Sequence, residues 1–210
     1  MIYFTADLHF GSEKILTKAN RPFASIEEMD QCLIANWNNI VSAKDTVYVI
    51  GDIGIHNKPI PARQLKQLNG TKHLIRGNHD TCLDDQHKLF DYFESVTDFL
   101  EIDEQDIHIT LCHYPIVYYQ HGYMIHGHIH NTKMDVYEIL KQLPCVLNAG
   151  VDVNHYRPVG LAELIENNRQ HYRDPKRGHM RSRWSANAPS KWWKADFRPL
   201  PVKNDVDSGV

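Results

Sequence analysis

The sequence has few of the features that mark secreted or membrane proteins. It contains no apolar run of roughly 18 residues, and its first residues, MIYFTADLH, lack the charged segment, apolar segment and cleavage site of a signal peptide. It has only four cysteines (Cys32, Cys82, Cys112 and Cys145), which are widely spread and form no CxxC pair. This spacing favours reduced thiols of an intracellular protein over a disulfide framework. These absences predict a soluble cytoplasmic chain without a membrane partner.

Charge is distributed unevenly along the 210 residues. Residues 171–210 carry nine Lys/Arg and four Asp/Glu, which is about +5, whereas the first 170 residues carry about −8. An acidic main part is a poor general surface for nucleic acid, but it is compatible with carboxylates that bind cations. We expect one globular domain over residues 1–170, followed by a basic, Trp-containing tail over residues 171–210 that is partly disordered at its end.

Six apolar runs end in polar clusters, which predicts six β-strands with polar residues at or just beyond their C-terminal ends. The runs span residues 2–9, 46–52, 73–80, 107–115, 123–130 and 145–153. Helical spacing predicts helices over 25–41, where Ser25 and Glu28 fit a capping box, over 62–68 and over 161–169. This order of elements predicts an α/β domain whose polar clusters collect along one sheet edge, the expected active site.

Five of these clusters carry residues that can bind metal ions. They are DLH (7–9), GD (51–52), GNHD (77–80), CHYP (112–115) and GHIH (127–130). Each cluster alone is also consistent with a turn, a cap, or a histidine in the core or in solvent. A strand through GHIH would point His128 and His130 to one face and Ile129 to the other. Five strand ends that all terminate in Asp, Asn or His are harder to explain by turn chemistry alone.

In content and order, the five clusters resemble the calcineurin-like metallophosphoesterases, whose pattern is DxH, GD, GNHD/E, H and GHxH, in particular small phosphoesterases of bacterial or phage type. The resemblance covers about the first 165 residues and implies a four-layer αββα sandwich of the metallo-dependent phosphatase type that holds two metal ions. By position, one metal ion would be held by Asp7, His9, Asp52 and His130, and the other by Asp52, Asn78, His113 and His128. Asp52 would bridge the two.

Such a site has a clear chemical use. Two divalent cations about 3.5–4 Å apart can hold a bridging hydroxide and clamp the attacking and leaving oxygens of a phosphoryl transfer. Carboxylate, amide oxygen and imidazole ligands without a thiolate suit manganese, our first expectation, as well as iron, zinc, nickel or cobalt. The expected function is therefore hydrolysis of a small, nucleotide-like phosphomonoester or phosphodiester. Cys112 should point away from the metal ions and pack in the core.

Three further residues are candidates for catalytic roles. His79 resembles the family's general acid, which gives a proton to the leaving alkoxide, and the adjacent Asp80 is a candidate partner that orients it. Arg76 resembles the phosphate-contacting arginine of the protein phosphatases, although a strand-end arginine in solvent fits equally well. Those phosphatases continue after GD with a further Asp and Arg, whereas this chain continues IGIHN. This departure argues against a phosphoprotein substrate.

Two other functions stay open from the sequence. The tail carries basic and aromatic residues that can contact phosphates and stack bases, which suggests a nuclease acting on single-stranded nucleic acid. These residues are Arg181, Arg183, Trp184, Trp192, Trp193 and Lys194. The same aromatic residues would also suit packing against the sheet. The second alternative is a non-catalytic protein-interaction scaffold with the same fold. The sequence does not indicate an oligomeric state.

Overall fold

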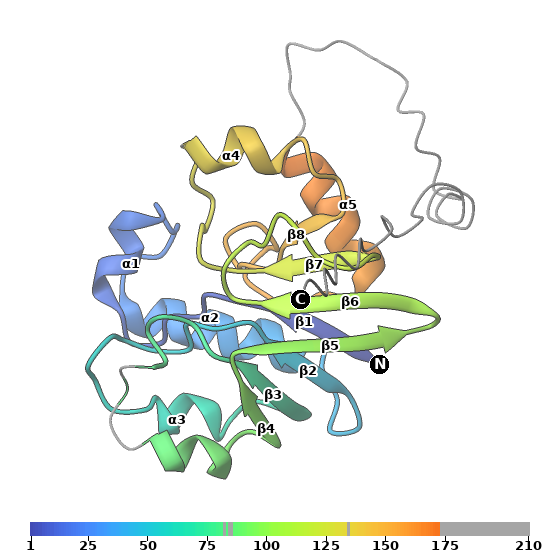
Figure 1. Cartoon of the computed structure of the whole chain (residues 1–210). Helices are drawn as coiled ribbons and strands as arrows, with labels where there is room; N and C mark the ends of the chain where they lie inside the picture. Colours follow the sequence, from blue (N-terminus) through green and yellow to red (C-terminus); the bar gives the residue numbers. More distant parts are fainter. Residues whose placement is uncertain (82, 84–85, 134, 173–210) are drawn as a thin grey trace, which may run out of the picture. The chain divides into compact units, whose positions relative to one another are not determined.

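The computed structural model describes residues 1–81, 83, 86–133 and 135–172, and within them eight strands form two four-stranded sheets (Figure 1). The first sheet has the order β1 (Ile2–Thr5), β2 (Thr46–Val49), β3 (Thr71–Ile75) and β4 (Ser95–Thr97). The second has the order β5 (Phe99–Glu104), β6 (Ile107–Cys112), β7 (Tyr123–His126) and β8 (Val146–Asn148). The predicted α/β class is confirmed at this level. The predicted tail lies, from residue 173 on, outside the described residues, and so does Cys82.

Strand direction brings the polar strand ends to one edge of each sheet. All pairs of the first sheet are parallel, as are β6–β7 and β7–β8, whereas β5 and β6 form an antiparallel pair. The two sheets meet where Ala6 bridges Gly150 in a parallel pairing just beyond β1 and β8. The ends of β1 and β8 therefore lie side by side, although they are far apart in the sequence.

The helices differ in length. They are α1 (Glu13–Lys18), α2 (Ile26–Asn38), α3 (Ala62–Leu65), α4 (Asp135–Leu140) and α5 (Leu161–His171), with a 3₁₀-helix, η1 (Gln86–Asp91). The predicted helices correspond to α2, α3 and α5, of which α3 is shorter than predicted. The Ser25 side chain caps α2 by accepting from the Glu28 amide at 3.1 Å, and the Glu28 carboxylate accepts in return from the Ala24 amide at 2.7 Å. None of the described helices is both long and apolar enough to cross a membrane.

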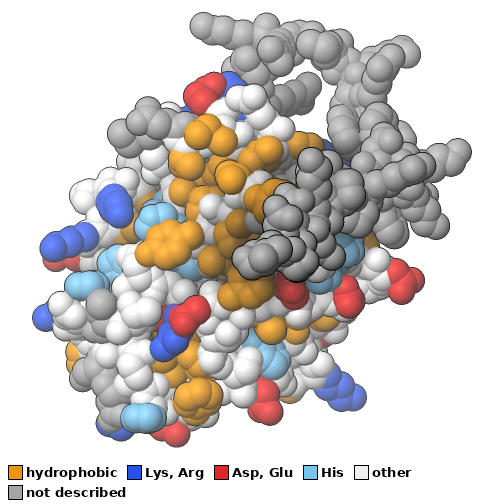
Figure 2. Space-filling model, in the orientation of Figure 1, with side chains coloured by type: hydrophobic (Ala, Val, Ile, Leu, Met, Phe, Trp, Pro, Cys, Tyr) orange, Lys and Arg blue, Asp and Glu red, His pale blue; other side chains and the backbone are white. Residues whose placement is uncertain are grey.

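Alternation along the strands sends neighbouring side chains to different hydrophobic clusters. Tyr3 packs with residues of α1, α2 and α3, whereas the next residue, Phe4, packs with Ile109 and Ile125 of the second sheet. On the other face of that sheet, Met124 packs with Leu140 and with Cys112, as expected for that cysteine. Figure 1 shows α4 on the side of the second sheet and α2 and α3 on the side of the first. On the face in Figure 2, hydrophobic side chains form a patch with histidines beside it.

The predicted strands are too long at their C-terminal ends, and this error concerns the site. The strand predicted over 123–130 ends at His126, and residues 127–130 are not a strand. His128 and His130 are therefore not placed by strand alternation, although Ile129 is buried in a hydrophobic cluster. The elements β4, β5, α1, α4 and η1 were not predicted.

Candidate metal centre

The backbone turns sharply at the strand ends that carry the predicted ligands. Five of the seven have a positive φ between 51° and 70°: Asp7, His9, Asp52, His128 and His130. Residues with a side chain seldom adopt this left-handed conformation, which clusters at functional sites when the surrounding structure enforces it. Here the turns are enforced by bonds between strand ends, because the Asp7 amide donates to Gly51 O and the His9 amide to Asp52 O, both at 2.9 Å.

Two glycines allow the strand ends to approach closely. Gly51 has a φ of +81°, and a Cβ there would lie 2.3 Å from His113 Nδ1. A Cβ on Gly77 would lie 2.3 Å from Asp52 Oδ1. A side chain at either position would therefore push apart two predicted ligand-bearing segments.

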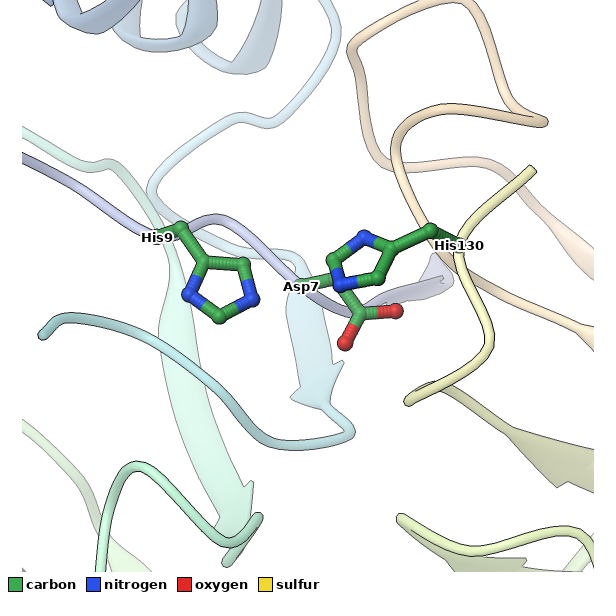
Figure 3. A group of neighbouring side chains, drawn as sticks. All are labelled: Asp7, His9 and His130. Carbon is green, nitrogen blue, oxygen red and sulfur yellow. The ribbon is translucent and has the colours of Figure 1, made fainter. Parts of the chain in front are cut away.

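The first group of converging side chains is Asp7, His9 and His130 (Figure 3). One donor atom from each lies within 4.8 Å of the others, and all three residues are buried. The rings of His9 and His130 stack with centroids 5.1 Å apart. Figure 3 shows the Asp7 carboxylate beside the His130 ring. These are three of the four predicted ligands of the first metal ion.

Asp52 lies next to this group and next to a second one. Its Oδ2 is 3.5 Å from His9 Nε2 and 3.5 Å from His113 Nε2. On the His113 side, Asn78 Oδ1 lies 3.2 Å from His113 Nε2 and 2.9 Å from His128 Nδ1. The structure therefore brings together all seven predicted ligands, with one oxygen of Asp52 between the two groups. Metal ligation by these residues stays a prediction.

Backbone and side-chain acceptors fix the orientation of three imidazoles. Nδ1 of His9 bonds Gly54 O at 3.2 Å, Nδ1 of His113 bonds Ile50 O at 2.9 Å, and Nδ1 of His130 bonds Asp152 Oδ2 at 2.9 Å. A carbonyl oxygen only accepts, so Nδ1 of His9 and of His113 carries the proton and Nε2 keeps its lone pair when the ring is neutral. Metal-binding histidines have this arrangement, in which the second ring nitrogen is held by an acceptor.

The unpaired side-chain atoms of the first group are suited to bind a cation. Asp7 Oδ2 and His9 Nε2 are buried and have no hydrogen-bond partner among the described residues, and a buried polar atom without a partner needs an explanation. Burial raises the pKa of Asp7, and burial together with the charge on His130 keeps the pKa of His9 well below its usual range. For His130, burial acts in the opposite direction, but the hydrogen bond to Asp152 and the charge of Asp7 outweigh it and raise the pKa. A bound dication would stabilise the Asp7 carboxylate and displace a proton from His130.

His79 lies at the edge of this centre. Its side chain forms a third group with His9 and Asp52, and its ring meets the His9 ring edge-on at 4.8 Å. The His79 amide donates to Asp52 Oδ1 at 2.9 Å, and His79 Nδ1 accepts from the His56 amide at 3.1 Å. Burial lowers the pKa of His79. Because Nδ1 accepts, the neutral ring carries its proton on Nε2.

Asp80 does not orient the His79 ring, contrary to the sequence-based hypothesis. Its Oδ2 accepts from the amides of Asp52 and Gly77 at 2.7 and 2.8 Å, and its Oδ1 accepts from the Ile53 amide at 2.9 Å. Burial and the charge of Asp52 raise the pKa of Asp80 to about 6, although these amide bonds oppose the shift. Asp80 therefore joins the GD and GNHD segments, and the ring of His79 is held by the His56 backbone instead.

Arg76 directly follows β3 and is partly exposed, which fits the strand-end arginine expected from the sequence, here paired with an exposed carboxylate. Its Nε and Nη2 bond the two carboxylate oxygens of Asp98 at 2.9 and 2.8 Å, and its side chain is 31% exposed. A paired, partly exposed arginine is not a free phosphate ligand, so this geometry argues against the phosphate-contacting role.

No family model matches the chain. The chain is 37% identical over 167 residues to the uncharacterized protein MJ1445 of Methanocaldococcus jannaschii, and the match covers 79% of this chain and 89% of that protein. The chain belongs to the MJ1445 family. It is also 34% identical over 93 residues to the Gene 66 protein of Mycobacterium phage L5, a match that covers 41% of this chain and 44% of the phage protein.

Solved structures are similar to this MJ1445-family member as well. The crystal structure of AQ665 from Aquifex aeolicus, a protein of unknown function, matches with a TM-score of 0.63 and 26% identity over 79% of this chain and 98% of that one. Weaker likenesses include the nuclease MPE of Pseudomonas putida (TM-score 0.42, 21% identity, 61% of each chain) and Yfce, a phosphoesterase from E. coli (TM-score 0.34, 16% identity, 71% and 77%). TM-scores this low do not assign a function to the MJ1445 family.

Two buried residues of the centre were not predicted from the sequence. Asp152, which holds His130, lies at the polar end of the run at 145–153, so the same strand-end signal applied to it. Arg21 bonds Asp152 and the backbone of Asp7, and no motif marks it in the sequence. Burial opposes ionisation of Asp152, but its bonds to His130 and Arg21 outweigh burial and lower its pKa.

His126 gives this MJ1445-family member an acid-sensitive group. It is fully buried, its Nδ1 bonds Gly127 O at 2.8 Å, and burial lowers its pKa to about 4. Between about pH 6.5 and pH 4 the unfolded chain therefore binds a proton that the folded chain does not, and stability should fall as pH falls through this window. We expect this effect in urea denaturation in the presence of EDTA. Between pH 7 and pH 4, the free energy of unfolding should fall by up to about 3 kcal/mol more for wild type than for His126→Asn. The exposed His87→Asn is the control, and parallel curves for wild type and His126→Asn would contradict the assignment.

Proposed function

We propose that the chain is a phosphoesterase that uses two divalent cations, one held by Asp7, His9, Asp52 and His130 and the other by Asp52, Asn78, His113 and His128. The observation that carries the proposal is the position of Asp52 Oδ2, 3.5 Å from Nε2 of both His9 and His113. One carboxylate oxygen that faces two imidazole lone pairs is unfavourable without cations and is suited to a pair of them. Two orphaned donor atoms, Asp7 Oδ2 and His9 Nε2, support the same proposal.

The proposal assigns the chemistry and the metal by ligand type. When bound, two such cations lower the pKa of a water molecule and offset the negative charge of a phosphate ester. The ligands are carboxylate, amide and imidazole groups, so manganese is the first choice, with iron, zinc, nickel or cobalt as substitutes. The residues of the chain would hold the ester near Asp52 and exclude bulk water on the buried side of Asp7 and His9.

A four-layer αββα sandwich is the fold that we propose around this site. Three separate hydrophobic clusters support it: one between the helices α1 to α3 and the first sheet, one that joins both sheets, and one between the second sheet and α4. Three apolar interfaces are what four stacked layers require.

His79 is proposed to act on the leaving oxygen. Its Nε2 carries the proton because Nδ1 accepts from the His56 amide, and its ring lies beside His9 and Asp52. In the neutral ring this N–H can donate a hydrogen bond to the departing oxygen, whereas transfer of the proton requires the imidazolium, which gives up the bond from the His56 amide at Nδ1 and becomes the neutral ring when the alkoxide is protonated.

The substrate is proposed to be a small, nucleotide-like phosphate ester. Tyr114, which directly follows His113, is 48% exposed, and its ring lies 4.7 Å from the His128 ring. An exposed aromatic ring beside the second ligand group offers a stacking surface for a nucleobase or another aromatic substituent. Tyr118, in the same loop, is 88% exposed. Action on single-stranded nucleic acid through the basic tail stays a separate proposal that rests on the sequence alone.

The test combines metal binding with turnover. After removal of metal, the protein should bind two equivalents of Mn²⁺ and then hydrolyse bis(p-nitrophenyl) phosphate, which metal analysis and absorbance assays measure directly. A screen of nucleotides, cyclic nucleotides, single-stranded nucleic acid and sugar phosphates would then define the substrate. Two bound cations without hydrolysis of any ester would favour the scaffold function, and failure to bind cations would refute the proposal.

A further inference from the structure

Arg21 and Asp152 form an ion pair behind the first ligand group. Arg21 Nε donates to Asp152 Oδ1 at 2.8 Å and Nη2 donates to Oδ2 at 3.1 Å. Neither side chain is exposed to solvent. A fully buried ion pair has lost its hydration, so it persists only when further hydrogen bonds satisfy its remaining atoms. The partners of these further bonds therefore indicate what the pair supports.

Two further bonds of the Arg21 guanidinium go to the strand end that carries Asp7 and His9, and another goes from Nη1 to Met29 Sδ at 3.4 Å. Nη2 donates to Asp7 O at 2.6 Å, and Nη1 donates to Leu8 O at 3.0 Å. Asp7 and His9 both have left-handed backbone conformations, with φ of 59° and 51°. Such a conformation is strained for a residue with a side chain and needs support from its surroundings. The planar guanidinium supplies that support to two successive carbonyl groups while it binds a carboxylate.

Asp152 supports the third member of the group. The Oδ2 of Asp152 accepts from His130 Nδ1 at 2.9 Å. The other ring nitrogen of His130, Nε2, is therefore the one that remains to bind a metal ion together with Asp7 and His9. The backbone of His130 is held as well, because Asn148 Nδ2 donates to His130 O at 2.8 Å. A single buried pair thus contacts the segments that carry all three side chains of Figure 3.

The second ligand group is held mainly by other residues, and one bond links it to the first group, because the His128 amide donates to Asp7 Oδ1 at 3.0 Å. His113 is oriented by Ile50 O, and the backbone around Asp52 is held by Asp80. None of the hydrogen bonds found for Arg21 and Asp152 in the described part of the chain reaches His113 or Asn78.

We propose that Arg21 and Asp152 are positioning residues that preset Asp7, His9 and His130 for one of the two cations, while the site of the other cation is linked to them only indirectly, through Asp7 and Asp52. This inference rests on the two-cation site of the proposed function. It predicts an unequal loss: weakening the pair lowers the affinity for one cation much more than for the other.

The substitution Arg21→Lys tests this separation. Lysine keeps the buried positive charge beside Asp152, but its single ammonium group cannot bond the carboxylate and two carbonyl groups in the fork geometry of arginine. In titration calorimetry with Mn²⁺, one of the two binding events should weaken about 10–100-fold, the range for residues behind a metal ligand, and the other should weaken much less. Circular dichroism and thermal unfolding of the metal-free proteins check that the fold is retained.

Arg157→Lys is the matched control. Arg157 also bonds a carboxylate through two nitrogens, those of its pair with Glu163, and it contacts none of the predicted ligands through the hydrogen bonds found for it. The Arg157→Lys variant should bind both cations with the affinities of the wild type. Should Arg21→Lys fail to fold, the double variant Arg21→Met with Asp152→Asn replaces it, because removing both charges leaves no uncompensated buried ion.

The outcomes separate this inference from the proposed function. Wild type that binds no Mn²⁺ refutes the two-cation site itself. Wild type that binds two Mn²⁺ ions, together with a folded variant that binds both with wild-type affinity, overturns only the positioning role. Equal weakening of the binding of both cations in a folded variant also overturns it, because the inference requires that one site depend on the pair much more than the other.

Discussion

Substitution of Asp52 by Asn should abolish activity and leave the fold intact. We expect kcat/KM for bis(p-nitrophenyl) phosphate to fall by ~10³-fold or more, beyond the ~10–100-fold typical of residues behind a metal ligand. Asp52 is 2% exposed, and its Oδ2 is the one oxygen found between the two ligand groups. An amide of the same shape removes a negative charge beside both cations, so binding of at least one Mn²⁺ should be lost in the same titration.

Although Asp52→Asn should lose activity, its thermal stability without metal should be retained or raised. In the wild type, Oδ2 faces Nε2 of His9 and of His113, and both nitrogens keep lone pairs because Nδ1 carries the proton. The amide NH₂ of the variant can donate to these nitrogens, while its carbonyl oxygen still accepts from the His79 amide. In EDTA, the variant should therefore unfold at the same temperature as wild type or higher.

The control for Asp52→Asn is the same exchange at Asp103, an aspartate of β5 whose side chain is 76% exposed. This variant should retain metal binding and turnover. Full activity of Asp52→Asn with two bound cations would remove Asp52 from its bridging position and the proposed site with it.

The location of the site was predictable from the sequence because its residues follow apolar runs. Asp7, Asn78 and His113 each come within three residues of the end of a strand, and the parallel arrangement carries these ends to one edge. The first observation does not depend on tertiary contacts, and the second follows from the alternation of strands and helices along the chain. The residue types of the site could therefore be anticipated before its geometry.

The conformation of the strand ends could not be predicted in the same way. The alternation in GHIH is that of a strand, yet a Cβ on Gly127 would lie 2.8 Å from Ala6 Cβ and 2.9 Å from Ile50 O. The chain turns there because segments more than 70 residues away in sequence pack against it. Local alternation carries no information on such contacts.

The partners of charged groups were the least predictable part. Asp80 stands next to His79 in the sequence, but its carboxylate accepts from amides of Asp52 and Ile53, which are 28 and 27 residues away. Arg76 forms an ion pair with Asp98 because Asp98 directly follows β4, which pairs with β3. This strand of three residues was not predicted. Each partner depends on which strands are neighbours, and short strands give too few residues for a pattern.

Removal of the His79 side chain should affect esters according to their leaving group. With His79→Ala, we expect hydrolysis of an alkyl phosphodiester to fall about 10²–10⁴-fold, the range for loss of a general acid. A nitrophenolate leaves without a proton, so hydrolysis of the nitrophenyl ester of the same phosphate should fall by less than ~10-fold. The structural reason is that Nε2 is the ring nitrogen that the His56 amide leaves free; as the imidazolium, in which the bond at Nδ1 is given up, the ring can transfer its Nε2 proton to the departing oxygen.

The His79→Ala variant isolates this role because the other contact of the residue is made by its backbone. The amide that donates to Asp52 Oδ1 is retained, so both cations should still bind with wild-type affinity. The exposed His87→Ala serves as the control and should hydrolyse both esters normally. An equal loss on the alkyl and the nitrophenyl ester would show that His79 stabilises the phosphate or the site in general and does not act on the leaving oxygen, because only proton donation distinguishes the two leaving groups.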